Sequence, residues 1–246
     1  MSTRVVVPCF DEAHRLDVDA FAELSRHVDQ VVFVDDGSTD DTIAVIGRMV
    51  EAEGDRVSLV ELDRNMGKAE AVRLGLLESI ARGSTLVGYL DADLATPISE
   101  MLRLVDVAAR RSDLTAVIGS RVALLGHTVR RRPARHYLGR LYATAASLAL
   151  GEVVYDTQCG AKVFRVGDPL RRALAEPFHD PWSFDVELLA RIIAGDDDPN
   201  DRMLEVPLNE WTDVGGSAVG PLAGARALWA LAGLRGRVDR HRLRQD

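Results

Sequence analysis

Short apolar runs rich in β-branched residues alternate, in the first half of the chain, with longer segments that carry apolar residues at helical spacing. The first pattern predicts buried strands and the second predicts amphipathic helices. Their alternation predicts an α/β fold in which a mostly parallel sheet is flanked by helices. The predicted strands are Arg4–Pro8, Val31–Asp35, Val57–Leu62, Leu86–Leu90 and Ala116–Gly119. The predicted helices are Asp40–Glu53, Lys68–Ala81 and Ile98–Arg110, the first capped by Ser38, Thr39 or Asp40.

The rhythm changes after Arg121, where an arginine-rich stretch leads into a helix of small residues predicted over Tyr137–Leu150. A short strand is expected at Lys162–Arg165, a further helix at Phe184–Ala194 and a late strand at Met203–Pro207. The second half of the chain is therefore expected to be built differently from the first.

A length of 246 residues is sufficient for one sizeable core, and 47% hydrophobic with 28% charged residues is ordinary for a globular protein. We expect a single domain over residues 1–246, with a first half over 1–121 and a C-terminal extension over 122–246.

The formal net charge of -8 argues against nucleic acid as a partner, because proteins that bind it usually carry a basic face. Arginines nevertheless cluster in two places, and two interpretations stay open for them. They form either solvated helix faces or contacts to an anionic ligand or membrane surface. The clusters are Arg130, Arg131, Arg132, Arg135 and Arg140, and Arg235, Arg237, Arg240, Arg242 and Arg244.

Two cysteines, Cys9 and Cys159, give neither a disulfide framework nor a metal-ligand spacing, which favours a reducing cytoplasm. The start of the chain lacks the pattern of a signal peptide. No apolar run approaches the roughly 20 residues that a membrane-spanning helix needs. We expect a cytoplasmic protein that is soluble or peripheral at the inner face of a membrane.

Two carboxylates separated by one residue, Asp91 and Asp93, follow the apolar run Leu86–Leu90. Alternation along a strand directs such a pair to one side, and the carboxyl end of a parallel strand is where open α/β sheets bind ligands. Mg²⁺ commonly binds one or two carboxylates together with substrate phosphates. An acidic strand end without a ligand is the alternative.

A second acidic strand end, Asp35-Asp36-Gly37-Ser38, opens the helix that follows it. A carboxylate there can accept hydrogen bonds from a base or a ribose, although a capping and turn motif explains the same residues. Two acidic strand ends in one sheet favour a site for a nucleotide and a metal ion.

These motifs, with Val7-Pro8-Cys9-Phe10-Asp11-Glu12 and Asn65-Met66-Gly67-Lys68, resemble family 2 of the glycosyltransferases, whose fold is GT-A. Three later segments are similar to the branch that transfers glucose to dolichyl and polyprenyl phosphates. They are Gly119-Ser120-Arg121, Asp156-Thr157-Gln158-Cys159-Gly160-Ala161-Lys162, and Trp182-Ser183-Phe184-Asp185-Val186-Glu187-Leu188.

The resemblance implies a donor site in the first half and an acceptor site in the second. Asp91 and Asp93 would hold Mg²⁺ or Mn²⁺ against the donor diphosphate, and Arg121 would contact phosphate during catalysis. The other donor-site residues would be Pro8, Glu12, Asp36 and Lys68. The acceptor-site residues would be Arg135, Gln158, Lys162 and Trp182.

Two departures from the family pattern limit this inference. Ala95 stands where related mannosyltransferases often have a glutamine, so that side-chain ligand is absent. Ala161 replaces the aromatic residue that usually follows the glycine of the Asp156–Gly160 segment.

The need for a general base depends on the acceptor, because a phosphate is largely dianionic at neutral pH whereas a hydroxyl needs deprotonation. Asp156 and Asp185 are the candidates for such a base, and a loop hydrogen-bond acceptor or a helix cap is the alternative for each.

The expected activity is inverting transfer of a hexose, first of all glucose from UDP-glucose to a polyprenyl phosphate. Mannose from GDP-mannose and a soluble hydroxyl acceptor are the alternatives within that class. A nucleotide-binding regulatory module without turnover is the alternative from another class. A nucleotidyltransferase is disfavoured because Cys9-Phe10-Asp11-Glu12 replaces the glycine- and lysine-rich phosphate loop expected after its first strand.

The segment Val219–Leu234 is apolar apart from Arg226, includes Trp229 and precedes the second arginine cluster. It either lies in a membrane interface, with the arginines at anionic head groups, or packs as a terminal helix on the core.

Overall fold

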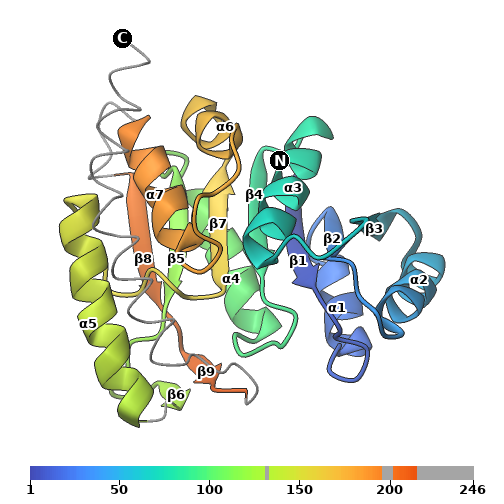
Figure 1. Cartoon of the computed structure of the whole chain (residues 1–246), viewed down its shortest axis with the longest axis horizontal. Coiled ribbons are helices and arrows are strands. Elements are labelled where there is room, and N and C mark those ends of the chain that lie inside the picture. Colours follow the sequence, from blue (N-terminus) through green and yellow to red (C-terminus); the bar gives the residue numbers. More distant parts are fainter. Residues whose placement is uncertain (131–132, 196–201, 215–246) are drawn as a thin grey trace.

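A seven-stranded sheet runs through the middle of the molecule in the order β3-β2-β1-β4-β7-β5-β8 (Figure 1). The computed structural model describes residues 1–130, 133–195 and 202–214. Neighbouring strands pair in parallel, except that β7 is antiparallel to both β4 and β5. The strands are β1 (Thr3–Cys9), β2 (Gln30–Asp35), β3 (Val57–Glu61), β4 (Leu86–Leu90), β5 (Ala116–Ser120), β7 (Ala161–Arg165) and β8 (Met203–Pro207).

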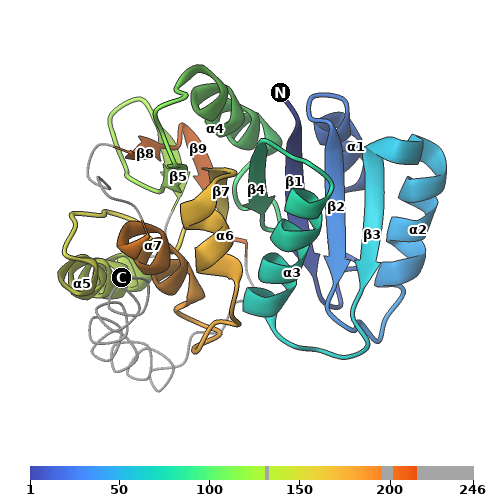
Figure 2. The same ribbon diagram turned by 90° about the horizontal axis from the view of Figure 1, so that it is seen from above.

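Helices cover both faces of this sheet, which makes three layers (Figure 2). One face carries α1 (Val18–Ser25), α2 (Thr42–Glu53) and α4 (Ile98–Arg110). The other carries α3 (Lys68–Ala81), α6 (Asp168–Leu174) and α7 (Phe184–Ala194). A single 3₁₀ turn, η1 (Gly54–Arg56), joins α2 to β3.

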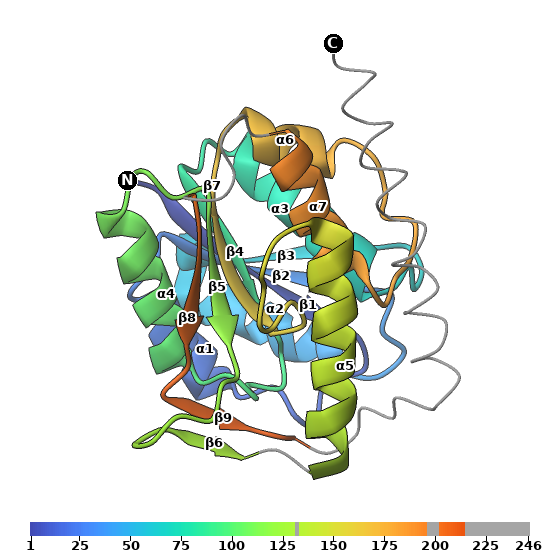
Figure 3. The same ribbon diagram turned by 90° about the vertical axis from the view of Figure 1, so that its left-hand side faces the viewer.

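Helix α5 (Pro133–Leu150) lies against α7, outside the three layers (Figure 3). Tyr142 and Ala146 on α5 pack against Val186 and Ala190 on α7, and Trp182 completes this small cluster. Strands β6 (Thr128–Arg130) and β9 (Glu210–Thr212) form a separate parallel pair.

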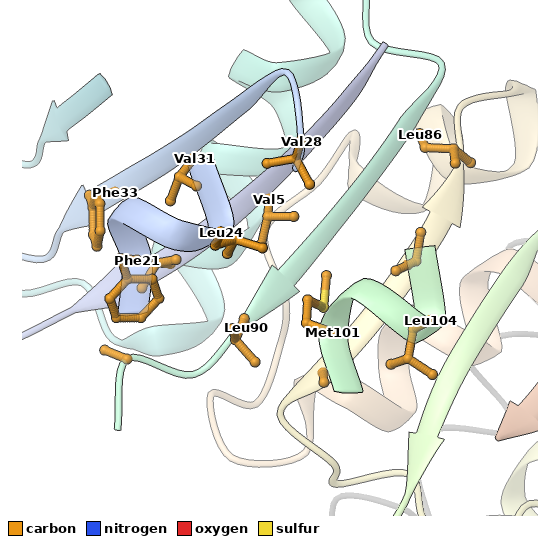
Figure 4. Close-up of a cluster of buried hydrophobic side chains, with 14 of the residues drawn as sticks. Val5, Phe21, Leu24, Val28, Val31, Phe33, Leu86, Leu90, Met101 and Leu104 are labelled. Atoms are coloured by element: carbon orange, nitrogen blue, oxygen red, sulfur yellow. The ribbon is translucent and has the colours of Figure 1, made fainter. Parts of the chain in front are cut away.

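Two apolar cores lie between the sheet and its helices. In the first, Phe21 of α1 meets Phe33 of β2 edge to face, with ring centroids 5.2 Å apart (Figure 4). In the second, the Tyr89 ring lies between those of Phe164 and Phe184. Burial of large aromatic side chains on both faces fixes the sheet as a rigid base for the loops at its edges.

The predicted α/β fold, with a mostly parallel sheet flanked by helices, is confirmed, and each strand and helix expected from the sequence is present. The N-cap of α2 is Asp41, which makes no side-chain cap bond, so the prediction that Ser38, Thr39 or Asp40 caps this helix is wrong. The Asp40 carboxylate nevertheless accepts the N–H of Thr42, the first residue of the helix. Helix α5 begins at Pro133, earlier than expected.

Apart from the 3₁₀ turn η1, four short elements were not predicted: α1, α6, β6 and β9. They contain 8, 7, 3 and 3 residues, too few for a repeating pattern to stand out. Within the residues that the structure describes, no helix is long and apolar enough to cross a bilayer. The segment Val219–Leu234 and the arginines after it lie outside the described residues.

Candidate active site

The carboxyl ends of β1, β2, β4, β5 and β8 meet at one edge of the sheet, which we call the carboxyl edge. Because β7 is antiparallel to β4, its first residues lie there too, with Ala161 opposite Leu90. The N–H of Asp91 donates to the carbonyl of Gly160 at 3.0 Å. This bond joins the loop after β4 to the loop before β7, and so joins the predicted donor and acceptor halves.

Asp91 and Asp93 lie in the turn after β4, because the strand ends at Leu90. The expectation that strand alternation holds them on one side is therefore wrong. A turn places them instead: Leu94 has a φ of 51°, and the Asp93 carboxylate accepts the N–H of Ala95 at 3.0 Å. The Lys68 ammonium is 2.6 Å from Oδ1 of Asp91.

Electrostatics distinguish these groups from surface charges. Burial raises the pKa of Asp93, and the charge of Asp91 adds to this. Burial opposes the charged form of Lys68, but the charges of Asp91 and Asp185 raise its pKa overall. Asp91, Asp93 and Lys68 therefore form one electrostatically coupled group at the carboxyl edge.

The two carboxylates suit a hard divalent cation in donor chemistry. Gly160 leaves room for the Asp91 carboxylate, since a Cβ at that position would lie 2.2 Å from Oδ2 of Asp91. Among the described residues, no group of three or more His, Cys, Asp and Glu side chains is placed to hold a metal ion. The protein can thus supply two oxygen ligands, and the rest of the coordination would come from phosphates and water.

The loops after β1 and β2 hold the predicted nucleoside-binding residues next to each other. Pro8 is buried on β1, opposite Val34 in the strand pairing. The Glu12 carboxylate accepts Nε of Arg15 at 2.7 Å and also binds its Nη2. The N–H of Glu12 donates to Thr42 Oγ1 at 2.8 Å, which ties this loop to the start of α2.

Asp36 anchors the loop that leads to Lys68. It is 2% exposed, and its two carboxylate oxygens accept the N–H groups of Met66 and Gly67 at 2.6 and 2.8 Å. Burial raises the pKa of Asp36, against the effect of these two bonds. Gly37 has a φ of 71° and lies so close to Arg64 that a Cβ would be 2.5 Å from its carbonyl carbon, which explains the glycine here.

On the acceptor side, Asp156 holds Arg121. Oδ2 of Asp156 accepts Nε of Arg121 at 2.6 Å and its backbone N–H at 3.0 Å, and Oδ1 accepts Nη2 at 2.7 Å. The N–H of Gln158 also donates to Oδ1, at 3.2 Å. The Arg121 guanidinium lies 5.3 Å from the ring centroid of Trp211. Four donors on one carboxylate make Asp156 an anchor for Arg121.

Asp185 is linked to a buried lysine. Nζ of Lys162 donates to Asp185 Oδ1 at 2.7 Å, to the Tyr89 hydroxyl at 2.8 Å and to the Cys159 carbonyl at 2.6 Å. The Tyr89 hydroxyl donates to the same Asp185 oxygen. Lys162 is fully buried and all three of its donors are used, so it orients Asp185 from beneath the site.

The remaining predicted acceptor residues lie near the junction of α5 and α7. The Gln158 amide donates to the Tyr142 hydroxyl and to the Trp182 carbonyl, both at 3.4 Å. Trp182 is partly exposed, and its ring meets that of Tyr142 edge to face at 5.2 Å. Arg135 belongs to α5, but its side chain lies outside the described residues.

Cys9 and Cys159 are both free and buried, and burial raises the pKa of Cys159 to about 11.

Two residues that support the site were missed from the sequence. Tyr89 lies within an apolar run and looks like any core residue. Glu205 on β8 accepts the N–H groups of Tyr155 and Asp156 at 2.7 and 2.8 Å, and so holds the loop that carries Asp156. Its 49-residue separation from Asp156 leaves no signal in the sequence.

A mostly parallel sheet flanked by helices, with paired carboxylates after β4 and acidic loops after β1 and β2, defines the class of the protein: it is an α/β protein whose candidate ligand site lies at the carboxyl ends of its strands, and it shares the GT-A fold of the solved glycosyltransferase structures described below. Comparison with known proteins then gives the family. The model of Glycosyl transferase family 2 matches residues 4–168, and the chain belongs to this family of glycosyltransferases.

Two related sequences and one solved structure illustrate the similarity. Dolichyl-phosphate beta-glucosyltransferase of Drosophila melanogaster is 31% identical over 244 residues, covering 88% of this chain and 69% of the fly protein. Undecaprenyl-phosphate 4-deoxy-4-formamido-L-arabinose transferase of Klebsiella pneumoniae is 31% identical over 65% of this chain and 48% of its own length.

Among solved structures, glucosyl-3-phosphoglycerate synthase of Mycobacterium tuberculosis, in complex with Mn²⁺, UDP-glucose and phosphoglyceric acid, superposes with a TM-score of 0.68. The alignment covers 95% of this chain and 79% of that one at 22% identity. At that identity the likeness establishes the shared fold.

Proposed function

We propose that this protein is a metal-dependent, inverting glycosyltransferase that moves glucose from UDP-glucose to a polyprenyl phosphate. The observation that carries the proposal is the junction at Gly160, where the Asp91–Asp93 turn adjoins the loop that carries Asp156 and Gln158. A donor diphosphate bound at this turn and an acceptor bound at this loop would therefore be adjacent. The names of the fly and Klebsiella relatives, each a transferase to a lipid phosphate, support the acceptor class.

On the donor side, Asp91 and Asp93 would hold Mg²⁺ or Mn²⁺, and the presence of Mn²⁺ with UDP-glucose in the mycobacterial complex supports that choice. The bound metal would neutralise charge on the leaving diphosphate. Glu12 and Asp36 lie on the two loops proposed for the nucleoside, and Pro8 lies near the end of β1, just before the first of them. Since Asp36 also fixes the Met66–Gly67 backbone, it couples nucleoside binding to the position of Lys68.

In the transfer step, an oxygen of the acceptor attacks the anomeric carbon from the face opposite the diphosphate. A carbon–oxygen bond forms, the bond to the diphosphate oxygen breaks with its electron pair, and the configuration inverts. Arg121, held at a fixed angle by Asp156, offers a cation for phosphate oxygens in this step. Gln158 and Trp182 lie where the acceptor would be positioned.

The state of the candidate bases favours a phosphate acceptor. Both oxygens of Asp156 are engaged by four donors, and Oδ1 of Asp185 accepts the Lys162 ammonium and the Tyr89 hydroxyl. The carboxylate oxygens engaged in this way have little hydrogen-bonding capacity left for a substrate hydroxyl. A phosphate, already ionised at neutral pH, needs no base, whereas a hydroxyl acceptor would.

The test is a screen of UDP-glucose, GDP-mannose and other nucleotide sugars, with Mn²⁺ or Mg²⁺. Each donor is offered to polyprenyl phosphate, to phosphoglycerate and to no acceptor. We expect transfer from UDP-glucose to the lipid phosphate and inversion at the anomeric carbon by NMR. Faster transfer to phosphoglycerate would contradict the proposed acceptor. A preference for GDP-mannose would contradict the proposed donor. Nucleotide binding without hydrolysis or transfer would favour the regulatory module.

The proposed place of action is the cytoplasmic side of a membrane, with peripheral contact. An acceptor phosphate at the head-group level is within reach of a protein that lies on the surface.

A further inference from the structure

The chain contains 30 lysine and arginine residues, and only two of them, Lys68 and Lys162, are lysines. Both lie at the carboxyl edge, and each contacts a site carboxylate, Asp91 or Asp185. An ammonium is a compact point charge on a flexible stem, whereas a guanidinium is a planar fork. Every other permanently cationic side chain in the sequence is an arginine, so the two lysines at this edge are distinguished by residue type.

The two lysines differ in how firmly they are held. Lys162 is fully buried and its three donors have fixed acceptors. The Lys68 side chain is 43% exposed, it is the first residue of α3, and its ammonium contacts Oδ1 of Asp91 at 2.6 Å. Lys68 can therefore leave its partner without breaking a buried network.

Asp91, unlike Lys68, needs an oppositely charged partner when the pair separates. Its Oδ1 is buried, and the Lys68 ammonium is the cation in contact with it. The Asp91 side chain is 29% exposed as a whole, but a carboxylate oxygen buried without a cation beside it is unfavourable. A divalent ion bound at the same oxygen would supply the compensation itself, and would repel an ammonium held at that distance.

We propose that Lys68 is an exchangeable counter-ion of Asp91. It occupies the carboxylate when no metal is bound, and it transfers to the donor diphosphate when metal and nucleotide enter together. This inference rests on the proposed function, since it takes a nucleoside diphosphate as the ligand that receives Lys68. No covalent step is involved: one ion pair is exchanged for another.

The exchange makes metal and nucleotide binding mutually dependent. A metal ion alone must displace Lys68 into water, so it binds weakly. A nucleoside diphosphate offers the displaced ammonium a new partner, and by linkage each ligand then strengthens the other. The role of Lys68 is to prevent the site from retaining metal in the absence of donor.

The test is Mn²⁺ binding, followed by the loss of the free-ion signal in electron paramagnetic resonance, with and without UDP. The variants Lys68→Met and Lys68→Gln remove the charge with little change in volume, and Lys68→Arg retains it. Without UDP, we expect both neutral variants to bind Mn²⁺ about tenfold more tightly than wild type, within the usual range of coupling between sites. The enhancement by UDP should shrink in both, while Lys68→Arg should resemble wild type.

An Asp93→Asn change in each background is the control, because it should abolish the Mn²⁺ signal change and so assign it to this site. Unchanged or weaker Mn²⁺ binding by both neutral variants, with wild-type circular dichroism, would overturn the exchange. Failure of the proposed function is distinguishable: wild type would then show neither UDP binding nor sugar transfer, whatever the Mn²⁺ affinities of the variants.

Discussion

At the scale of single residues, the carboxylates after β4 are the groups on which the proposed chemistry depends. Replacing Asp91 or Asp93 with alanine should lower transfer by about 100- to 1,000-fold, because each change removes a proposed ligand of the cation that would stabilise the leaving diphosphate. A chelator should reduce the wild-type rate to the same level. The measurement is the initial rate of transfer, with Asp106→Ala, an exposed carboxylate of α4, as the matched control. A chelator-insensitive wild type would remove metal dependence from the proposal.

Gly160 is the residue at which the two halves of the site touch. A Cβ there would be 2.2 Å from the Asp91 carboxylate, so Gly160→Ala must displace either Asp91 or the loop before β7. We expect transfer to fall about 100-fold with little change in melting temperature, since a small misplacement of a catalytic group has that effect. Gly47→Ala is the control: nothing lies near the added methyl on α2, and helix propensity should raise stability by up to about 1 kcal/mol. Equal activity of the two variants would mean that this contact is unimportant.

Asp36 has a proposed nucleoside-binding role and also supports the Met66–Gly67 backbone. Asp36→Ala should raise the KM for the nucleotide sugar more than it lowers kcat, because a contact remote from the anomeric carbon contributes mainly uniform binding. Asp41→Ala provides the comparison, since Asp41 is exposed and makes no side-chain cap bond. A large fall in kcat at unchanged KM would contradict the proposed role.

At the scale of elements, a charged cluster of His179, Glu187 and Arg191 stabilises α7, the helix that carries Asp185. Glu187 accepts the N–H and Nδ1 of His179 at 2.9 and 2.7 Å and Nη2 of Arg191 at 2.7 Å. Burial alone would raise the pKa of Glu187, but these partners hold it below its ordinary value. A depressed carboxyl pKa stabilises the fold above the unfolded-state pKa of about 4.3, and the stabilisation is lost as the pH falls through the folded-state value.

Glu187→Gln should therefore destabilise the protein by about 1–3 kcal/mol near neutral pH, and the difference from wild type should shrink below about pH 4. Denaturant unfolding across this range measures it. Glu51→Gln, at an exposed position of α2, should show no such trend. A difference that grows toward acid would reverse the sign of the linkage and exclude this explanation.

At the scale of the whole molecule, the proposed function requires that the protein reach a lipid acceptor. We predict that the full chain sediments with anionic vesicles at low salt. Binding should weaken with added salt and when the chain is shortened after Leu234, because the arginines removed would meet the head groups. Vesicles of neutral lipid are the control. A full chain that stays in the supernatant at low salt would make a soluble acceptor the better hypothesis.

The sequence alone determined the layered architecture, because strands and helices of five or more residues with strong periodicity have one favourable way to bury their apolar faces. It also singled out Asp91 and Asp93 as candidate metal ligands, because the two carboxylates directly follow an apolar run. The sequence did not predict the short elements α1, α6, β6 and β9, because their secondary structure depends more on tertiary contacts than on their own periodicity.

Only the tertiary structure decided which residues share the site. The antiparallel entry of β7 brings Gly160 to Asp91, and β8 brings Glu205 to the backbone of Asp156, across gaps in sequence that no local pattern encodes. The tertiary structure also distinguishes the two lysines: Lys68 is half exposed beside Asp91, whereas Lys162 is buried beside Asp185. The physical reason is that periodicity records which face of an element is buried, whereas the partner of a charge depends on how separate elements pack.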